Sequence, residues 1–252
     1  MFMIGAFFDV DGTLFRNSLL IEHFKKLIKY EVLDVSVWIS HGRSTFQEWA
    51  IRKGDYEEYL LEVSAAYRDS LEGIHTSVID FIADQVIAQN WEKTYVFTRD
   101  QLKWHQALGH GIFFISGSPD FLISRMAQKY EAMDYCASKY EVKNNCFTGE
   151  VQPMWDHIHK SVALDKLVEK YSIDLENSYA YGDTSGDLSM FRRVGNPVAI
   201  NPNVKLFRSI LEDGDLLDRT RVVVERKDMI YHIDPKSRKI NFESAEKTEK
   251  SP

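Results

Sequence analysis

The stretch FFDVDGT at residues 7–13 places two aspartates, Asp9 and Asp11, after an apolar run and before a Gly-Thr turn. Residues 3–9 are predicted to form a buried strand, so both carboxylates come at its carboxyl end, where α/β sheets hold their ligands. Because Val10 separates them, the two side chains can leave the strand end on the same side. Such a pair can bind a hard cation and leave one oxygen free to attack an electrophile. The alternative is a strand followed by an ordinary Asp-Gly turn.

Composition narrows the class of protein. The chain has 252 residues, a net charge of −7 and a 44% hydrophobic content, enough for one α/β domain or a core with a smaller domain. The negative charge argues against nucleic acid or an anionic membrane as a partner. The two cysteines, Cys136 and Cys146, lack CxxC spacing and are expected to be free thiols. The apolar N-terminus lacks a basic region, so we expect a cytoplasmic protein. Its oligomeric state is left open.

The order of helix and strand signals predicts the architecture. Residues 17–93 show apolar positions at helical spacing without strand signals, and a helical block directly after the first strand indicates an inserted cap. Strands and helices alternate afterwards, which is typical of a doubly wound parallel α/β sheet with a Rossmann-like core. The predicted strands are 112–116, 178–182 and 197–200, the predicted helices are 98–109, 119–130, 160–171 and 186–193, and a hairpin turn is predicted at Asn144-Asn145. The expected division is therefore a core of residues 1–15 and 94–212 and a cap of residues 16–93.

Residues 213–252 form a C-terminal extension of different character. The stretch RVVVERKDMIYHIDPKSRKINF predicts two strands joined by a turn at residues 234–237, DPKS. The last residues, AEKTEKSP, are expected to be disordered. The extension could cover a sheet edge, dock on the cap or mediate self-association, and the sequence does not choose among these.

Two further features at predicted element ends could bind an anion. Ser116 and Gly117 end a strand, so the serine hydroxyl and the following backbone N–H groups can donate to anionic oxygens, although a plain helix cap is an equal reading. Lys160 begins a predicted helix after two histidines, His157 and His159, which lack zinc spacing and are interpreted as loop residues. A solvated surface lysine is the alternative for Lys160.

A second acidic pair follows the strand 178–182. Asp183 and Asp187 lie four residues apart in the sequence GDTSGD, and the glycines allow the loop to bend sharply around a metal ion. An acidic turn that caps a helix is the alternative.

Taken together, the order Asp-x-Asp-Gly-Thr, Ser, Lys and Gly-Asp-x-x-Gly-Asp closely resembles the haloacid dehalogenase superfamily of phosphatases. The helical cap between the first two core strands is similar to that of the phosphoserine-phosphatase-like branch. The resemblance covers about residues 1–210 and leaves the extension unexplained.

The resemblance implies a role for each motif residue. Asp9 would be the nucleophile that forms an aspartyl-phosphate, and Asp11 the general acid and base. Mg²⁺ would be held by a carboxylate oxygen of Asp9, the backbone carbonyl of Asp11 and the carboxylate of Asp183, with Asp187 supporting the loop. The phosphoryl oxygens would be held by Thr13, Ser116, Gly117 and Lys160.

The substrate is expected to be a small phosphorylated metabolite of unspecified identity. Phosphoserine phosphatases carry a glutamate nine positions after the nucleophile that contacts the substrate amine, and here that position is Ser18. Substrate choice is expected to lie in the cap, where Trp38, Phe46 and Trp49 could line a cage for a quaternary amine or belong to a helix core. A phosphotransferase or mutase with the same aspartyl-phosphate, and a non-catalytic regulatory protein, are alternatives to the phosphatase.

Overall fold

The computed structural model describes residues 2–237 except 42, 52 and 55, and the side chains of residues 40–45 are also outside the description. Within these limits it contains one eight-stranded sheet in the order β4-β3-β2-β1-β5-β6-β7-β8. The strands are β1 (Gly5–Phe8), β2 (Gly111–Pro119), β3 (Asp134–Lys143), β4 (Cys146–Gln152), β5 (Tyr179–Gly182), β6 (Asn196–Ile200), β7 (Arg221–Arg226) and β8 (Met229–Ile233). The inner pairs are parallel, and only the outer pairs β3–β4 and β7–β8 are antiparallel.

Helices cover both faces of this sheet, which confirms the doubly wound α/β fold. The helices are α1 (Leu19–Lys29), α2 (Val35–His41), α3 (Arg43–Ala50), α4 (Tyr56–Ser70), α5 (Thr76–Asn90), α6 (Val96–Ala107), α7 (Asp120–Lys129), α8 (His157–Tyr171), α9 (Leu188–Phe191), α10 (Val204–Glu212) and α11 (Gly214–Arg219), with a 3₁₀ turn η1 (Ser185–Asp187). Phe8 packs on the face that α6 and α7 cover, and Phe7 packs on the face covered by α8 to α11. Because successive side chains of a strand point to opposite faces, one strand contributes to the hydrophobic core on each side of the sheet.

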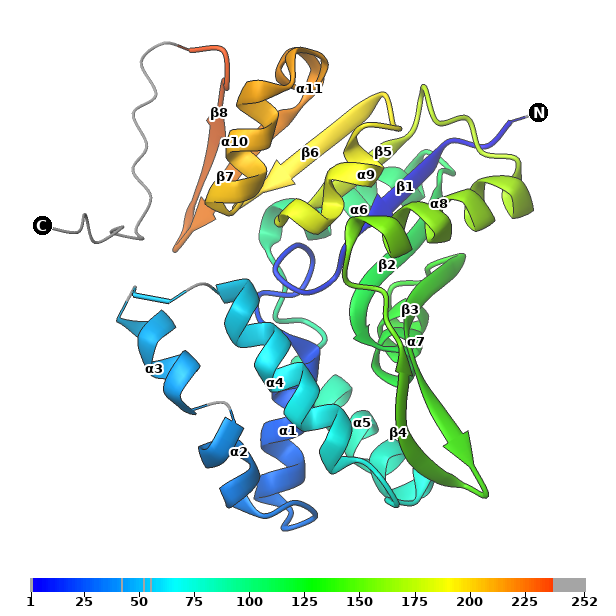
Figure 1. The fold of residues 1–252 in the computed structure, drawn as a ribbon. Coiled ribbons are helices and arrows are strands. Elements are labelled where there is room, and N and C mark those ends of the chain that lie inside the picture. The colour runs from blue at the N-terminus through cyan, green and yellow to red at the C-terminus, as the bar shows by residue number, and fades with distance from the viewer. Residues whose placement is uncertain (1, 42, 52, 55, 238–252) are drawn as a thin grey trace, which may run out of the picture.

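Helices α1 to α5 form a separate layer beside the sheet (Figure 1). Their own core is closed by the buried His23, whose ring nitrogens lie 2.8 Å from the Tyr67 hydroxyl and 3.2 Å from the Ile79 carbonyl oxygen. Burial lowers the pKa of His23 to about 4, so the ring is neutral and ties α1 to α4 and α5 without a buried charge.

The aromatic residues considered for a cage pack against one another in this layer. Trp38 and Trp49 both contact Phe46, and all three contact Tyr59. In the described part of the chain, none of them lines the cavity that Asp9 and Asp11 line. Their arrangement matches the alternative reading, a core between helices.

The extension continues the core sheet. Strand β7 pairs in parallel with β6, and β8 folds back on β7. A turn is present at residues 234–237 as predicted, since the N–H of Ser237 donates to the Asp234 carbonyl at 3.0 Å, and the segment after it lies outside the described residues. This turn does not join the two described strands, because the chain between them reverses at Lys227-Asp228, where Lys227 has φ 56°. This register pairs Val222 with Ile233 and lets Ile233 pack on the core, whereas Pro235 has no N–H to donate to a ladder. The predicted disordered end lies outside the described residues.

Other boundaries differ by a few residues from the predictions. Helix α8 begins at His157 rather than Lys160, because the Asp156 side chain caps it by accepting from the N–H groups of Ile158 and His159. Helices α10 and α11 were not predicted.

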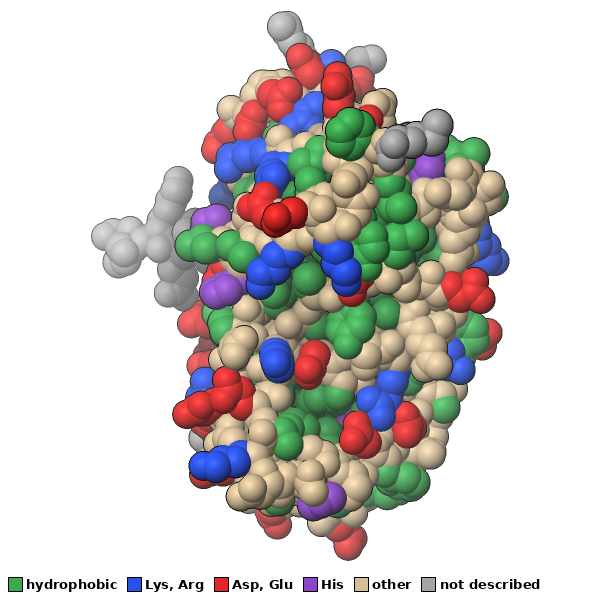
Figure 2. Space-filling model, turned by 90° about the vertical axis from the view of Figure 1, so that its right-hand side faces the viewer, with side chains coloured by type: hydrophobic (Ala, Val, Ile, Leu, Met, Phe, Trp, Pro, Cys, Tyr) green, Lys and Arg blue, Asp and Glu red, His purple; other side chains and the backbone are tan. Residues whose placement is uncertain are grey.

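No described helix has both the length and the apolar character needed to cross a membrane. On the face seen in Figure 2, acidic, basic and hydrophobic side chains are mixed with one another.

We predict that Gly195→Ala destabilises the fold, because a Cβ there would overlap the backbone carbonyl of Glu176, which cannot rotate away. Urea unfolding should show a loss of about 1–3 kcal/mol or more. Gly214→Ala is the matched control, because nothing lies within 4 Å of its Cβ. That variant should be neutral or gain up to about 1 kcal/mol. Equal stability of the two variants would contradict the packing argument.

Candidate active site

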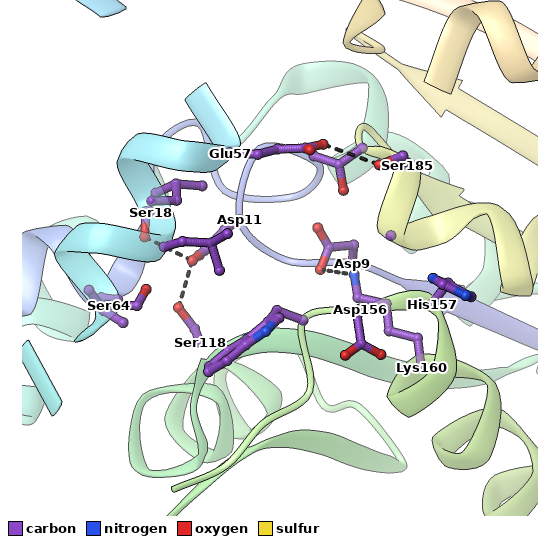
Figure 3. A pocket seen from close by; sticks show the side chains of 17 residues that line it. Asp9, Asp11, Ser18, Glu57, Ser64, Ser118, Asp156, His157, Lys160 and Ser185 are labelled. Atoms are coloured by element: carbon purple, nitrogen blue, oxygen red, sulfur yellow. Dashed lines mark hydrogen bonds and ion pairs between the residues drawn. The ribbon is translucent and has the colours of Figure 1, made fainter. Parts of the chain in front are cut away.

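A cavity of about 300 Å³ lies at the carboxyl ends of the central strands, with one wall supplied by the cap (Figure 3). Four of the residues predicted to be catalytic, to hold the metal or to bind phosphate line it: Asp9, Asp11, Gly117 and Lys160. The other lining residues are Ser18, Leu20, Glu57, Leu60, Leu61, Ser64, Ser118, Trp155, Asp156, His157, Thr184, Ser185 and Gly186. Strand ends that meet at one edge of a parallel sheet account for this convergence.

Lys160 is buried and pairs with two carboxylates. Its ammonium nitrogen lies 3.0 Å from Oδ1 of Asp9 and 2.6 Å from Oδ1 of Asp187. The residue is in the first turn of α8, which projects it under the end of β1. The alternative of a solvated surface lysine is therefore wrong.

The two histidines before Lys160 also differ from the prediction. His157 and His159 belong to the first helical turn rather than to a loop, and His159 has an acidic partner because its Nδ1 lies 2.8 Å from Oδ2 of Asp156. His157 lines the cavity.

The acidic loop after β5 is organised by Asp187. Its Oδ2 accepts hydrogen bonds of 3.1 Å from the backbone N–H groups of both Asp183 and Thr184. The carboxylates of Asp9, Asp183 and Asp187 each offer an oxygen, and these oxygens lie within 4.8 Å of one another. Asp187 thus fixes the loop that brings Asp183 next to Asp9.

Burial controls the protonation of these groups. It raises the pKa of Asp9 to about 7, against the lowering effect of the Lys160 ammonium, while the charges of Asp187 and Asp11 add to the rise. Burial also raises the pKa of Asp183 well above its usual value, and the charge of Asp9 reinforces it. For Lys160, burial opposes the charged form, but Asp187 and Asp9 outweigh it and raise its pKa. Three carboxylates thus share one ammonium ion, and the excess negative charge favours a cation.

Asp11 is held by donors from both the cap and the core. Its Oδ2 accepts from the hydroxyls of Ser18 at 3.0 Å and Ser118 at 2.6 Å, and its Oδ1 accepts from the N–H of Leu19 at 3.0 Å. Burial raises the pKa of Asp11, although these hydrogen bonds lower it in part. Ser18, at the position where the resemblance would lead one to expect a glutamate, therefore orients Asp11 and caps α1.

The hydroxyls of two residues expected to hold phosphate have hydrogen-bond partners within the protein. The Thr13 hydroxyl donates to Oδ1 of Asp183 at 2.8 Å, and Thr13 is fully buried. The buried Ser116 hydroxyl accepts from the N–H of Ser118 at 3.2 Å. Neither residue is among those lining the cavity, whereas Gly117 and Ser118 are.

The cap helix α4 is joined to the core across the mouth of the cavity by Glu57. Its Oε1 accepts from Nδ2 of Asn203 at 2.7 Å and from the Ser185 hydroxyl at 3.3 Å, and its Oε2 lies 3.0 Å from the ammonium group of Lys205. Asn203 also donates its backbone N–H to the Asp183 carbonyl at 2.8 Å. The position of the cap is therefore linked to the acidic loop.

Several of these residues were missed by the sequence analysis. Ser118 directly follows Ser116 and Gly117, so its local signal was present, but of these three residues only Ser116 and Gly117 were predicted to bind an anion. Glu57, Leu61 and Trp155 have no local signal because their role depends on how the cap meets the core.

The residues present fit a divalent metal ion. Asp9, Asp183 and Asp187 are hard oxygen donors, as Mg²⁺ prefers, and together they carry more negative charge than Lys160 balances. The Asp11 side chain is not part of this group, and its predicted contribution is through the backbone carbonyl.

Comparison with known proteins places these features in a family. The family model described as haloacid dehalogenase-like hydrolase matches residues 6–192. A protein of Mycobacterium tuberculosis named as a probable phosphatase is 24% identical over 211 residues, which cover 79% of this chain and 69% of that protein. A phosphoserine phosphatase of the same organism is 27% identical over 223 residues, covering 83% of this chain and 68% of the relative.

Solved structures show the same fold. A Bordetella pertussis protein of unknown function has a TM-score of 0.68 at 17% identity, covering 84% of this chain and 96% of that one. A phosphoserine phosphatase, solved as an analogue of its phospho-aspartyl intermediate, has a TM-score of 0.58 at 19% identity, with 90% and 96% covered.

We predict that Mg²⁺ stabilises the protein more at pH 7.5 than at pH 5.5. Folding raises the pKa of Asp9 from 3.8 to about 7. Between these two pH values the metal-free folded state binds more protons than the unfolded state, so its free energy of unfolding falls as the pH rises. A cation bound to the ionised carboxylates offsets this loss. Thermal unfolding with EDTA or Mg²⁺ should show a gain of roughly 5–10 °C at pH 7.5, with the ion at about a hundred times its dissociation constant.

In this thermal experiment Asp183→Asn is the control and should lose most of the Mg²⁺ effect. An equal effect at both pH values in the unchanged protein would contradict the predicted competition between protons and metal.

Proposed function

The chain belongs to the haloacid dehalogenase-like hydrolase family, and on that basis we propose that it is a Mg²⁺-dependent phosphatase that hydrolyses a small phosphomonoester through an aspartyl-phosphate on Asp9. The observation that carries the proposal is that Asp9 and Asp11 line one cavity together with the buried Lys160. Relatives named probable phosphatase and phosphoserine phosphatase support the same class of reaction.

In the first step Asp9 attacks phosphorus and the bond from phosphorus to the leaving oxygen breaks. Lys160 holds Oδ1 of Asp9, which leaves the other oxygen to attack. Asp11 gives its proton to the leaving oxygen, so an alcohol departs rather than an alkoxide. The raised pKa of Asp11 supports this role, because the acid must be protonated before the step.

In the second step water attacks the phosphorus of the aspartyl-phosphate and Asp11, now ionised, takes its proton. Phosphate leaves and the Asp9 carboxylate is restored. The three donors that hold Asp11 keep its carboxyl group oriented during both transfers. Splitting the hydrolysis into two displacements lowers the barrier of each.

Electrostatics allow one anion to approach another in this site. When bound by Asp9 and Asp183, Mg²⁺ would supply positive charge to the phosphoryl oxygens. Lys160 contributes a fixed ammonium group, and Gly117, which lines the cavity, is proposed to bind a phosphoryl oxygen through its backbone N–H. We assign Thr13 to the support of Asp183 and Ser116 to the shape of the β2 end, in keeping with their hydrogen bonds.

The proposed division is a catalytic core of residues 1–15 and 94–212, a cap of residues 16–93 and an extension of residues 213–252 that continues the sheet. The cap closes over the substrate and excludes water. The protein is proposed to act in the cytoplasm on a small phosphorylated metabolite.

Replacing Asp9 by Asn should lower phosphate release by at least about 1,000-fold, because the amide is a poor nucleophile. The assay compares phosphoserine, phosphocholine, sugar phosphates, nucleoside monophosphates and p-nitrophenyl phosphate, with Mg²⁺ and with EDTA. Asp100→Asn on the surface of α6 is the control and should retain activity. Near-normal turnover by a folded Asp9→Asn would sink the assignment of the nucleophile. Transfer of phosphate to an added alcohol, without hydrolysis, would instead indicate a phosphotransferase.

Asp11→Asn should still form some phospho-enzyme but hydrolyse it slowly, because no group remains to take the proton of the attacking water. A single-turnover experiment with labelled substrate, quenched in acid, measures the protein-bound phosphate over time. We expect it to persist at least about 100 times longer than in the unchanged protein. Dephosphorylation at the usual rate would show that another group activates the water.

A further inference from the structure

Two large apolar side chains line the catalytic cavity although they remain exposed. Trp155, from the core loop before α8, is 39% exposed, and Leu61, from the cap helix α4, is 53% exposed. Leu20 and Leu60 add to the same apolar wall. Ligand sites in proteins are typically lined in this way, with a few polar groups that fix orientation. The proposed phosphatase chemistry uses none of these four residues.

The backbone of Trp155 is held directly against the two loops that carry the catalytic groups. A Cβ added to Gly117 would lie 3.0 Å from the Trp155 Cβ, and one added to Gly186 would lie 2.8 Å from its carbonyl oxygen. The approach requires glycine at Gly186, and at Gly117 a Cβ would be tighter than most Cβ contacts in proteins. The indole is thereby positioned relative to the phosphate-binding end of the cavity.

Hydrogen bonds fix the chain on both sides of Trp155. The N–H of Met154 donates to the Ser138 hydroxyl at 3.1 Å, and that hydroxyl donates to the Gly117 carbonyl at 2.7 Å. On the other side, Asp156 caps α8. With its backbone anchored, Trp155 has only two side-chain torsions left to fix, so its aromatic surface costs little conformational entropy on binding.

The cap side of the wall is held in place by Glu57. This residue lies one turn of α4 before Leu61, and its carboxylate bridges to Asn203 and Lys205 of the core. While the bridge is formed, Leu60, Leu61 and Ser64 face the cavity that Trp155 also lines. The cap and the core thus present apolar groups to the same volume.

The charges around this wall disfavour a second anion on the substrate. Asp11, Glu57 and Asp156 line the same cavity, and Lys160 is already paired with Asp9 and Asp187. A carboxylate or second phosphate on the organic part of a substrate would meet carboxylates at short range.

We propose that Trp155 and Leu61 bind the organic part of the substrate, and that the substrate is a phosphomonoester of an apolar alkyl or aryl alcohol without a second acidic group. This inference rests on the proposed phosphatase function. It assigns to the two residues the choice of leaving group and leaves the phosphoryl chemistry to Asp9 and Asp11.

The test uses methyl, ethyl, butyl and hexyl phosphate, whose leaving alcohols differ in apolar surface while their chemistry stays nearly constant. With Mg²⁺ present, kcat/KM should rise roughly twofold to fourfold per methylene that reaches the wall, so the hexyl-to-methyl ratio should be at least about 30. A carboxylate at the end of the butyl chain should lower kcat/KM at least tenfold.

Trp155→Ala and Leu61→Ala should each reduce the hexyl-to-methyl ratio, by about tenfold for the indole and about threefold for the leucine. The ratio cancels any general loss of active protein. Ile158→Ala is the matched control, since Ile158 is 61% exposed but is not among the lining residues, and its ratio should stay unchanged. A ratio near one in the unchanged protein, or a ratio that neither variant alters, would overturn the proposal.

Binding separates a failure of this inference from a failure of the proposed function. Alkylphosphonates of the same chain lengths cannot be hydrolysed at the P–C bond, and calorimetry gives their dissociation constants whether or not the protein turns over any ester. Affinity that rises with chain length and loses that dependence in Trp155→Ala would support the apolar site even if no ester, p-nitrophenyl phosphate included, were hydrolysed. Affinity independent of chain length would refute it, even in an active phosphatase.

Discussion

The ion pairs of Lys160 with Asp9 and Asp187 are the constraint on which the site depends, because these three ionisable groups meet where water is largely excluded. Removing charges from water is costly, so each must be paired with good geometry. That geometry requires the carboxyl ends of β1 and β5 to lie side by side and the first turn of α8 to begin next to them. Parallel pairing of β1 with β5 provides this register, and the Asp156 cap fixes the start of α8.

The residues around this charge cluster also connect the cap to the core. Asp11 takes hydrogen bonds from Ser18 and Leu19, at the start of the first cap helix, and from Ser118 in the core. The acidic loop in turn is tied through Asn203 to Glu57 of the cap. The start of α1 thus contacts Asp11, and the start of α4 separately contacts the acidic loop. A movement of the cap would act on both.

Much of this arrangement could be predicted from the sequence, because motifs at strand ends must converge in a doubly wound sheet. Asp9, Asp11, Lys160 and Asp183 were found in this way. The directions of the Thr13 and Ser116 hydroxyls could not be found, since they depend on which neighbour is nearer once the loops are folded.

Features set by long-range packing were also beyond the sequence. The reversal at Lys227 depends on Ile233 reaching the core, which local turn signals at Pro235 do not reveal. Trp155 and Leu61 lie far apart in the chain and are joined only by the cavity. Helix α10 does carry a local signal, Asn203 before an amphipathic segment, although none of the motif residues lies in it.

The central place of β1 in the sheet has a consequence for how the chain folds during synthesis. Strand β1 is made before both of the strands that it pairs with, β2 and β5, and β5 follows it by roughly 170 residues. At about 5–20 residues per second, a ribosome needs roughly 10–30 seconds to cover that distance. Throughout this interval one edge of an apolar strand, with Phe7 and Phe8 in it, has no partner from its own chain. The cap helices, whose contacts are mostly local, can form meanwhile. The nascent chain is therefore most exposed to aggregation before β5 emerges, and binding by a chaperone would matter most in that period.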